Sequence, residues 1–521
     1  MKPTVQARGA TRAAGSFPLV LTTAVLVASC GGGGETGEAR SDPLGAASCA
    51  SRVNSTHDKL LECVTLAGVR QHQAALQAIA DANGGVRAAG TPGYDQSVQY
   101  IVDKMTAAGY VVTLNAFPFT YVALPVLRQI GPVTATYESG AFTGTGYGNV
   151  SAAVTAVDIN LAPPRASTSG CEATDFAGFP AGNIALVQRG TCSFAIKALN
   201  AQAAGASAVI IFNQGNTPAR EELIVGTLAP SAAAIPVVGA SFADGVALAQ
   251  AGSVATVRVD PPQLVTQYNV IAESRDGDPN NVVMAGAHLD SVLRGPGIND
   301  NGSGSAAILE TAIQMAKVKP RNKLRFAWWG AEESGLIGST AYVAGLSEAE
   351  RAKIALYLNF DMVGSPNHVF FIYDGDDSDA VGAGAGPSGS DDIEKTFEAF
   401  FNSRGIPFKG TDFSGRSDYG PFIANNIPAG GLFTGAEGIK TAEEASLWGG
   451  TAGVQYDPCY HLRCDTFANN NDYALDVNSD AIAYAVLQFS MNTTAINAKR
   501  SKGNFKMPEL EEDDHHGNAT R

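Results

Sequence analysis

Apolar residues recur at helical spacing in the first part of the chain that has a clear pattern. The two sets of positions are Leu76, Ile79 and Ala80, then Val98, Ile101, Met105 and Ala108. Gly-Gly and Thr-Pro-Gly sequences lie between the two sets, and both break helices. The pattern therefore predicts two amphipathic helices, and the apolar residues that follow predict a strand at residues 110–114.

From about residue 124 the pattern changes to short runs that favour strands. These runs cover residues 184–187, 209–212, 235–238 and 254–259, with one helical patch at 194–204. Several short strands separated by turn signals are typical of a β-rich domain. We therefore predict a separate domain over residues 124–262.

After residue 267 the predicted strands alternate with helical segments. The sequence predicts strands at 282–285, 324–329 and 354–360 and a helix at 306–316. This alternation indicates an α/β fold, in which helices cover both faces of one sheet. Residues 56–123 and 263–498 together form this predicted domain, and its binding sites should collect where the strands end.

The first thirty residues have the charge order of an export signal. Basic residues precede an apolar run at 17–28 that is too short to span a bilayer. The run ends in Val-Ala-Ser before Cys30, which resembles a bacterial lipoprotein signal. We predict a signal peptide at 1–29, a lipidated tether at 30–55 and a membrane anchor at Cys30. The protein would belong to the bacterial cell envelope, or be secreted if the signal is an ordinary cleaved one.

Charge narrows the range of partners. The 521 residues include 35 Lys and Arg against 50 Asp and Glu, which gives a net charge of −15. An acidic protein is a poor match for phosphate backbones, so we expect no nucleic-acid partner. Charged residues also dominate the last segment, 499–521, which predicts a polar tail without a fold.

The cysteines support export. Besides Cys30 there are six, in three local pairs: Cys49 with Cys63, Cys171 with Cys192, and Cys459 with Cys464. Six cysteines allow fifteen pairings, and we prefer the local one because each pair lies within one apparent structural unit. Thiolate metal ligation is disfavoured because the sequence has no Cys-x-x-Cys spacing.

Histidines and carboxylates follow the predicted strands of the α/β region. These residues are His288, Asp290, Asp300, Glu332, Glu333 and Asp361, with His461 inside the last cysteine pair. Any one of them alone would be read as a helix cap, a turn residue or an unremarkable histidine. Together they offer nitrogen and oxygen ligands without thiolate, which suit zinc, with manganese or cobalt as alternatives.

The order of these residues within their motifs resembles peptidase family M28, the zinc aminopeptidases. The motifs are His-x-Asp, Gly-Pro-Gly-Ile-Asn-Asp-Asn-Gly-Ser-Gly, Gly-Ala-Glu-Glu, Asn-Phe-Asp-Met and Cys-Tyr-His. The similarity extends over residues 281–487 and is strongest to the Streptomyces-type secreted enzymes. It implies a mixed central sheet with helices on both faces, the zinc peptidase fold.

Residues 175–213 resemble the protease-associated (PA) domain, as in yeast vacuolar aminopeptidase Y, which implies a PA insert in the peptidase fold. This segment contains no candidate nucleophile or metal cluster. A role in positioning or gating substrate and a purely structural role are equally open.

The M28 resemblance implies two zinc ions per chain. One would be held by His288, Asp361 and a bridging Asp300, and the other by Glu333, His461 and the same Asp300. A bridging carboxylate keeps two metals roughly 3.5–4 Å apart, which suits the clamping of a tetrahedral intermediate.

The resemblance also implies the catalytic residues. Glu332 would act as the general base and Asp290 would orient the His288 imidazole. Tyr460 would donate its hydroxyl to the developing oxyanion. One difficulty is that neighbours on a strand point to opposite faces, so Glu332 and Glu333 can share a site only if the strand has ended before them.

The substrate would be held by its free amine and its first side chain. The amine would contact Glu332, Asp361 and the backbone carbonyl of Arg416. Met362 and Phe433 would line an apolar pocket, although packing in the core explains them equally well. Related enzymes also hold the peptide bond after Asp300 in the cis form.

Calcium and oligomeric state are less defined. Asp476 and Asp480 match a calcium-binding segment of the Streptomyces-type enzyme, but the N-terminal ligands of that site are not evident. We favour a monomer that acts on peptides.

Taken together, these features predict a secreted dinuclear zinc aminopeptidase that favours hydrophobic first residues. Three alternatives use a similar scaffold. A carboxypeptidase or dipeptidase would need an Arg or Lys facing the substrate carboxylate, and a glutaminyl cyclase would bind a single zinc. A non-catalytic binding protein with a PA domain would have lost ligands, whereas every ligand position and Glu332 are intact.

Overall fold

The computed structural model describes residues 46–380, 382 and 384–500. The predicted signal peptide, the lipidation site Cys30 and the tail from residue 501 lie outside the described residues. Among the helices within those ranges, none combines the length and the apolar character needed to cross a membrane.

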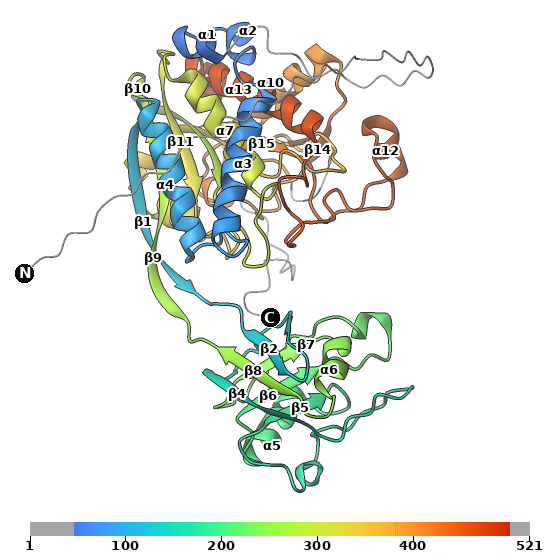
Figure 1. Cartoon of the computed structure of the whole chain (residues 1–521). Coiled ribbons are helices and arrows are strands. Elements are labelled where there is room, and N and C mark those ends of the chain that lie inside the picture. The colour runs from blue at the N-terminus through green and yellow to red at the C-terminus, as the bar shows by residue number, and fades with distance from the viewer. Residues whose placement is uncertain (1–45, 381, 383, 501–521) are drawn as a thin grey trace, which may run out of the picture. The chain divides into compact units, whose positions relative to one another are not determined.

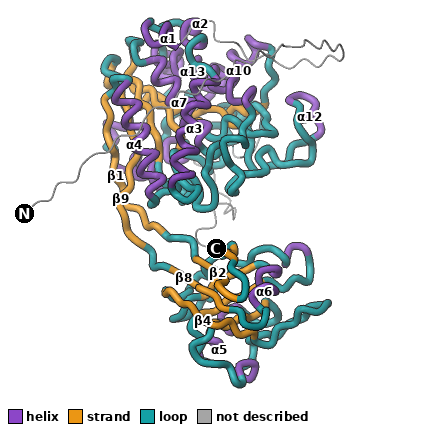
Figure 2. Tube along the Cα trace, viewed as in Figure 1, coloured by secondary structure: helices purple, strands orange, loops and turns teal. Residues whose placement is uncertain are grey.

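A mixed sheet forms the centre of the α/β region (Figures 1 and 2). Its eight strands lie in the order β1 (Val111–Tyr121), β9 (Gln263–Glu273), β11 (Asn322–Trp329), β10 (Asp278–His288), β12 (Ile354–Phe360), β15 (Ala429–Phe433), β13 (Phe371–Tyr373) and β14 (Lys409–Thr411). Strands β11, β10, β12 and β15 run parallel, whereas β1 pairs antiparallel with β9, and β13 with β15. The mixed sheet predicted by the resemblance is therefore confirmed.

Apolar side chains pack on both faces of this sheet. In β10, Val283 and Ala285 join one hydrophobic cluster, and Val282 and Met284 join another on the opposite face. This alternation is what the period-two geometry of a strand requires when both faces are buried. Helices on both faces, as predicted, supply the other half of each cluster.

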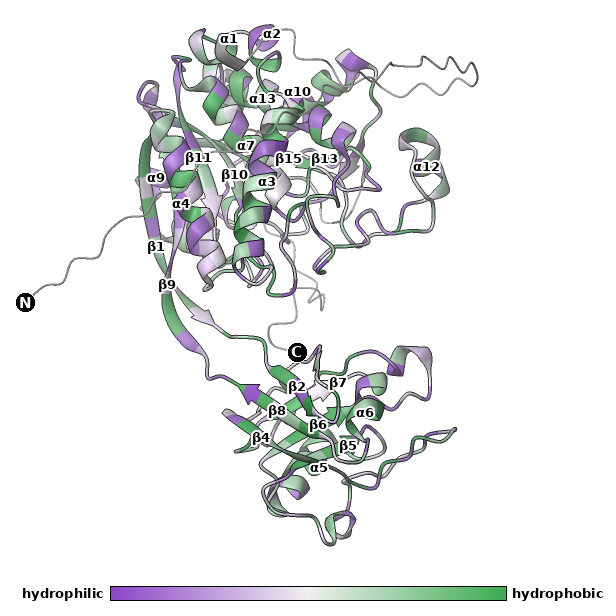
Figure 3. Ribbon diagram, in the orientation of Figure 1, coloured by the Kyte–Doolittle hydropathy of each residue, from purple (hydrophilic) through white to green (hydrophobic). Residues whose placement is uncertain are grey.

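The larger cluster is completed by α3 (Leu66–Ala82), α4 (Pro92–Ala107), α7 (Gly302–Met315), α10 (Ser390–Arg404) and α13 (Asp472–Met491). The smaller cluster is completed by α8 (Ile337–Gly345) and α11 (Gly420–Ile423). Figure 3 shows hydrophilic and hydrophobic residues alternating along α3 and α4, as expected of helices with one buried face. Both helices were predicted from this spacing, and the helix predicted at 306–316 corresponds to α7.

A second sheet contains the strands of the predicted β-rich domain. Its order is β3 (Ala135–Tyr137), β2 (Val126–Gly131), β8 (Val254–Val259), β4 (Gly148–Ala156), β5 (Ile184–Gln188), β6 (Ala208–Phe212) and β7 (Val237–Ala240). Helices α5 (Phe194–Ala203) and α6 (Phe242–Leu248) and the 3₁₀ turns Ala173–Phe176 and Pro218–Arg220 connect them. Strand β7 begins after Pro236, later than predicted, because proline lacks the N–H that a strand ladder uses.

The chain leaves the first sheet and returns to it through two neighbouring strands. Residues of β1 and β9 pair along their full length, from Val111 opposite Glu273 to Tyr121 opposite Gln263. The intervening residues build the second sheet, so its strands form an insertion between two paired strands of the first.

The predicted tether, 30–55, is structured in its described part, which corrects its extent. Residues Ala46–Ser51 form helix α1, and α2 (His57–Leu61) follows it closely. A disulfide joins Cys49 to Cys63, and Asn54 is buried and donates from Nδ2 to the carbonyl of Gln314 in α7. The small polar residues of this segment suggested a tether, but a disulfide and the hydrogen bond from Asn54 hold residues 46–55 against the folded chain.

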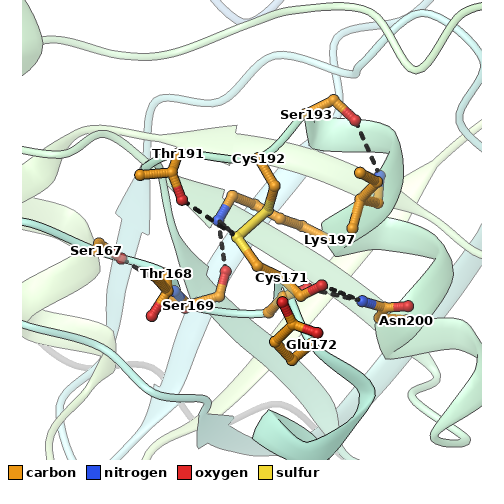
Figure 4. Close-up of a disulfide and its surroundings, with 12 residues drawn as sticks. Ser167, Thr168, Ser169, Cys171, Glu172, Thr191, Cys192, Ser193, Lys197 and Asn200 are labelled. Carbon is orange, nitrogen blue, oxygen red and sulfur yellow. Dashed lines mark hydrogen bonds between the residues drawn. A yellow bond between two sulfur atoms is a disulfide. The ribbon is translucent and has the colours of Figure 1, made fainter.

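All three local cysteine pairs are disulfides: Cys49–Cys63, Cys171–Cys192 and Cys459–Cys464. Figure 4 shows the second, with Lys197 of α5 beside it. The Lys197 ammonium is buried, donates to the carbonyl of Ser169 at 2.5 Å and lies 3.7 Å from the Cys171 sulfur. Burial lowers the pKa of Lys197 to about 8, and the contacts fasten α5 to the disulfide loop.

The remaining helices are short. They are α9 (Glu348–Arg351), α12 (Ala442–Trp448) and α14 (Thr494–Lys499). Thr441 caps α12 in a capping box with Glu444, which explains why seven residues suffice for a helix here.

Candidate metal centre

Three parallel strands carry three of the five predicted metal ligands, and Glu332, to one edge of the first sheet. His288 is the last residue of β10, and Asp361 directly follows β12. Glu332 and Glu333 lie in the turn after β11, whose last residue is Trp329. Because β11, β10 and β12 are neighbours, their carboxyl ends meet and bring these side chains together.

Two histidines lie on either side of Asp300. His288 Nε2 is 3.2 Å from Asp300 Oδ1 and 3.3 Å from Asp361 Oδ1. His461 Nε2 is 3.2 Å from Asp300 Oδ2 and 2.9 Å from Glu333 Oε2. Each oxygen of Asp300 thus faces a different histidine, so one carboxylate serves two groups of ligand atoms.

The distances fit tetrahedral metal sites. Zinc bonds of about 2.0–2.2 Å at tetrahedral angles keep neighbouring ligand atoms about 3.3–3.6 Å apart, close to the separations above. Asp300 Oδ2, Glu333 Oε1, Asp361 Oδ1 and His461 Nε2 are buried without a hydrogen-bond partner of acceptable geometry. Buried polar atoms in native proteins are normally satisfied, so four such atoms within one cluster of ligand residues fit bound cations.

The electrostatics of the cluster also favour cations. Four buried or half-buried carboxylates, those of Asp300, Glu332, Glu333 and Asp361, surround the two histidines. Burial, together with the Asp300 carboxylate, raises the pKa of Glu333 to about 7. Burial alone would lower the pKa of His461, but Glu333 and Asp300 raise it to about 11. A cluster with this many carboxylates stabilises positive charge. That charge can come from protons on the histidines or from bound divalent ions.

The turn after β11 resolves how neighbouring glutamates share one site. Ala331 adopts a left-handed backbone with φ of 56°, so the chain leaves the strand geometry before Glu332. Asp290 then accepts hydrogen bonds from the backbone N–H groups of Glu332 at 3.2 Å and Glu333 at 3.4 Å. The expected obstacle does not arise, because the strand has ended.

Asp290 also lies beside His288. Its backbone carbonyl is 3.1 Å from His288 Nδ1 and its Oδ1 is 3.7 Å from the same atom. The side chain is fully buried. Asp290 therefore connects the imidazole to the turn that carries the glutamates, a broader role than the one predicted from sequence.

A second aspartate, missed in the sequence, supports Asp300. Asp465 accepts hydrogen bonds from the N–H groups of Asn299 at 2.8 Å and Asp300 at 3.0 Å. The bond between Asp300 and Asn301 is cis, as the family resemblance implied. Gly304 allows α7 to approach β12, because a Cβ at this position would lie 2.1 Å from the Phe360 carbonyl oxygen. Asp465 directly follows Cys464, the last cysteine of the sequence, and this position was the one signal that could have identified it.

The metal centre opens into a cavity of about 330 Å³. The predicted substrate residues Arg416, Met362 and Phe433 line it, as does Tyr460. So do further residues not predicted from sequence: Phe371, Tyr373, Thr411, Asp412, Ser417, Glu437 and Tyr456. The Ser417 hydroxyl donates to Asp361 Oδ2 at 2.6 Å, a contact that only the structure shows.

The predicted calcium residues lie elsewhere. Asp480 forms an ion pair with Arg404 at 3.0 Å. Within the described residues, three groups of side chains have the geometry to hold a metal, and neither Asp476 nor Asp480 belongs to one. Two of the groups share His288, and the third is an acidic cluster of Asp374, Asp376 and Glu394.

Comparison with known proteins identifies the chain. The model of peptidase family M28 matches residues 269–486, and that of the PA domain matches residues 153–248. An aminopeptidase of Pseudomonas aeruginosa is 52% identical over 452 residues, which cover 85% of this chain and 84% of that protein. The chain belongs to peptidase family M28. This M28 peptidase carries a PA domain and is an enzyme, a metallo-exopeptidase of the aminopeptidase type.

Other known proteins are similar to most of the chain. The protein named "Probable lipoprotein aminopeptidase LpqL" of Mycobacterium tuberculosis is 42% identical over 90% of this chain and 93% of its own length. Among solved structures, a zinc aminopeptidase of Bacillus subtilis matches with a TM-score of 0.55 and 26% identity. That match covers 81% of this chain and 94% of the Bacillus protein.

The Cys459–Cys464 disulfide encloses Tyr460 and His461, which predicts a role in zinc binding. His461 adopts a left-handed backbone with φ of 59°, a conformation that a free loop would leave readily. Replacement of both cysteines by serine should weaken zinc binding about 10–100-fold, the usual effect of losing a group that orients a ligand. Competition with a chelator measures this affinity.

The matched control replaces Cys171 and Cys192, which lie in the second sheet's domain. That variant should keep the zinc affinity of the parent protein. Equal affinities in all three proteins would show that the disulfide is not needed to hold His461.

Proposed function

We propose that this M28 peptidase is an exported dinuclear zinc aminopeptidase that favours hydrophobic first residues. The observation that carries the proposal is Asp300, whose two oxygens each lie 3.2 Å from a different histidine. In the proposed ligand sets, His288 and Asp361 complete one site and Glu333 and His461 the other. Zinc, when bound there, acts as a Lewis acid toward the substrate carbonyl and makes water more acidic.

Glu332 is the proposed general base. Its Oε2 atom is 3.9 Å from His288 Nε2, farther than the nearest oxygens of Asp300 and Asp361, so we assign it to proton transfer. Burial raises the pKa of Glu332 well above its usual range, and Asp361 and Asp418 raise it further. A carboxylate with a raised pKa takes a proton from the attacking water more readily and can pass it to the leaving amine.

Tyr460 is the proposed oxyanion donor. It lines the cavity, and its ring stacks on the His461 ring with centroids 3.8 Å apart. Burial and the nearby Asp300 and Glu333 carboxylates keep its pKa well above the usual value. The hydroxyl therefore stays protonated and can donate to the oxygen that becomes negative during attack.

The cavity favours an amine over a carboxylate. Among its lining residues the one non-histidine cation is Arg416, and this guanidinium already pairs with Glu437 at 2.7 Å. The carboxylates of Glu332 and Asp361 are available to a protonated or neutral amine instead. This arrangement argues against the carboxypeptidase alternative, which needs a cation facing the substrate.

A preference for hydrophobic first residues rests on the aromatic wall. Phe433 is half-buried, and its ring stacks on Phe371 with centroids 5.9 Å apart. Met362 is 2% exposed, so it lies beneath the pocket and offers little surface to a substrate. A wall of this kind releases water when an apolar side chain enters.

Export and domain boundaries are part of the same proposal. Three disulfides fit an oxidising compartment, and one relative is named a lipoprotein. We propose lipidation at Cys30, which the mass of the mature N-terminal residue would test. We also propose residues 124–262 as the PA domain and residues 56–123 and 263–498 as the peptidase domain.

The test compares leucine p-nitroanilide with its N-acetylated form. We expect hydrolysis of the free-amine substrate and at least a 100-fold slower reaction with the acetylated one, since loss of an amine that pairs with buried carboxylates costs about 3 kcal/mol or more. Zinc per chain is measured on the same sample. Equal rates on both substrates would contradict aminopeptidase specificity, and a single zinc with full activity would contradict the dinuclear site.

A further inference from the structure

A fully buried arginine, Arg87, is not explained by the metal ligands or by the cavity. It lies in the connection between α3 and α4, is 0% exposed and does not belong to the cavity lining. Arginine is almost never fully buried unless its charge and its donors are compensated. The contacts of Arg87 show what compensates them.

The Arg87 guanidinium donates to three backbone carbonyls of one loop. Nη1 donates to Leu289, Nε to Pro296 at 2.9 Å and Nη2 to Gly297 at 2.6 Å. This loop, 289–297, follows β10 and contains no helix or strand, and its three acceptor residues are buried. Buried carbonyls outside regular structure need a donor, and Arg87 satisfies three of them. We call these three hydrogen bonds the Arg87 clamp.

The three carbonyls belong to the two ends of that loop. Leu289 directly follows His288, whereas Gly297 precedes Asp300 by three residues. The Gly297 carbonyl also accepts a hydrogen bond at 3.0 Å from the N–H of Gly302, the first residue of α7. One planar guanidinium therefore ties the residue next to His288 to the turn that carries Asp300.

The backbone of Arg87 is fixed to the same loop. Its N–H donates to Ser291 Oγ at 2.9 Å, and its carbonyl accepts from the Ser291 N–H at 3.4 Å. The side chain therefore starts from a fixed point, and its planar group is held at three donors. A guanidinium held in this way is a rigid spacer between the two ends of the loop.

The charge of Arg87 is compensated by the acidic residues of the metal centre. The three acceptors of the clamp are neutral carbonyls. The negative charges that act on the guanidinium are those of Asp290, Asp465, Asp300 and Glu333. Burial lowers the pKa of Arg87 to about 10 although these carboxylates raise it, so the side chain is a cation at neutral pH.

We propose that Arg87 is a positioning residue that sets the separation between His288 and Asp300. It acts through the loop 289–297 and touches neither metal nor substrate. The proposal rests on the first proposed zinc site, that of His288, Asp361 and Asp300, because two of these three ligands flank the loop. Without the clamp the two ends of the loop can move apart, and the ligand atoms would have to be reordered when the metal binds.

The two proposed zinc sites should differ in their dependence on Arg87. The first site takes His288 and Asp300 from the two sides of the loop. The second site takes Glu333 and His461 from segments that the clamp does not join, and it shares only Asp300 with the first. Loss of the clamp should therefore weaken the first site more than the second, whereas a general loss of stability would weaken both alike.

A role through charge alone predicts the opposite sign. A buried cation repels zinc, so Arg87→Met would then raise the affinity for zinc, and Arg87→Lys would leave it unchanged. The clamp predicts a lower affinity in both variants. A lysine keeps the charge but cannot hold both ends of a loop with one planar fork.

The experiment measures the zinc affinity of each site in the full chain by stepwise competition with a chelator. We expect Arg87→Met and Arg87→Lys to lower the affinity of the first site about 10–100-fold and that of the second less than about threefold. Asp361→Asn removes a ligand of the first site and Glu333→Gln one of the second, so these two variants assign the binding steps.

Cobalt(II) in place of zinc gives a spectroscopic readout that loss of stability alone would not change. Its visible absorption depends on the coordination geometry, so both Arg87 variants should show an altered spectrum for the first site. A spectrum and a zinc affinity like those of the parent protein in Arg87→Lys would overturn the proposal. A rise in zinc affinity in Arg87→Met would overturn it too.

The matched control is Lys197→Met. It removes a cation that is also 0% exposed and also donates to a backbone carbonyl, but in the second sheet's domain, so zinc affinity should not change. Thermal unfolding of the metal-free proteins shows which variants fold. If neither Arg87 variant folds, Ser291→Ala removes the acceptor of the Arg87 N–H and should lower the affinity of the first site a few-fold. An unchanged affinity would then overturn the proposal.

Failure of the proposed function would be distinguishable. Equal hydrolysis of free-amine and acetylated substrates by the parent protein would contradict aminopeptidase specificity, and lower zinc affinity in the Arg87 variants would still support the clamp. A single zinc in the parent protein would contradict the dinuclear site. The clamp would then be supported if both Arg87 variants bound that ion more weakly, and overturned if they bound it equally well.

Discussion

Replacement of Glu332 by alanine is expected to lower kcat by about 10³–10⁴-fold, the upper part of the range for removal of a general base. Zinc content should stay near that of the parent protein, because Glu332 lies outside both proposed ligand sets. The physical reason for the loss is that Glu332 has a raised pKa and, unlike its neighbour Glu333, is not needed to hold a metal in the proposed ligand sets. Burial and the charges of Asp361 and Asp418 set that pKa.

The measurement combines steady-state kinetics on leucine p-nitroanilide with zinc analysis. Glu332→Gln is the closer variant, since it keeps the size of the side chain and removes its basicity. Glu394→Gln is a matched control, because Glu394 is equally buried, 5% exposed against 7%, but lies outside the cavity lining. A large loss of zinc in Glu332→Gln would make Glu332 a ligand, and retention of kcat would exclude it as the base.

Replacement of Asp300 by alanine is expected to remove both zinc ions and all measurable activity. Asp300 is the only residue in the proposed ligand sets shared by both sites, so its loss takes one oxygen from each. Each proposed site would then keep only two protein ligands, so the affinities of both sites for zinc should fall together. Zinc per chain by mass spectrometry, read beside activity, measures the effect.

The same variant should also be less stable. A metal that binds only the folded protein adds RT ln(1 + [L]/Kd) to the free energy of unfolding, about 4 kcal/mol at a thousandfold excess over Kd. Asp300→Ala should therefore unfold at the lower temperature of the chelator-treated parent protein. Asp374→Asn removes a buried carboxylate from the separate acidic cluster and serves as the control. Two zinc ions retained in Asp300→Ala would disprove the bridge.

The residues of the proposed mechanism come from different elements of the fold. Strand ends carry His288 and Asp361, a turn carries the glutamates, and a disulfide loop carries Tyr460 and His461. Hydrogen bonds to Asp290 hold the turn with the glutamates, and hydrogen bonds to Asp465 hold the segment with Asp300. Such support keeps ligand atoms within bonding range before a metal arrives, which lowers the ordering cost of binding it.

Sequence patterns were sufficient for the fold class and for many elements. The buried run at 354–360 is β12 without a shift, and 254–259 is β8. The predicted α/β fold is confirmed because periodicity reports which side of an element is buried. The ends of strands were harder to predict where polar residues continue a strand beyond its apolar run. Strand β10 starts at Asp278, well before its apolar run, because backbone pairing continues through polar residues.

The sequence by itself determined which chemical groups this protein brings to its site. The order of His288, Asp300, Glu333, Asp361 and His461 within their motifs indicated the family, and the structure gathers all five. Their individual roles stay predictions for the zinc and kinetic measurements. Local cysteine spacing also led to the three disulfides.

Only the tertiary structure decided which side chains meet. The order of β11, β10 and β12 in the sheet sets which strand ends are neighbours, and no periodicity along one chain segment contains that order. The left-handed turn at Ala331 decides that both glutamates face one site. The contact between Arg416 and Glu437 joins segments that carry no shared pattern. Such contacts depend on how distant segments pack, which sequence spacing does not encode.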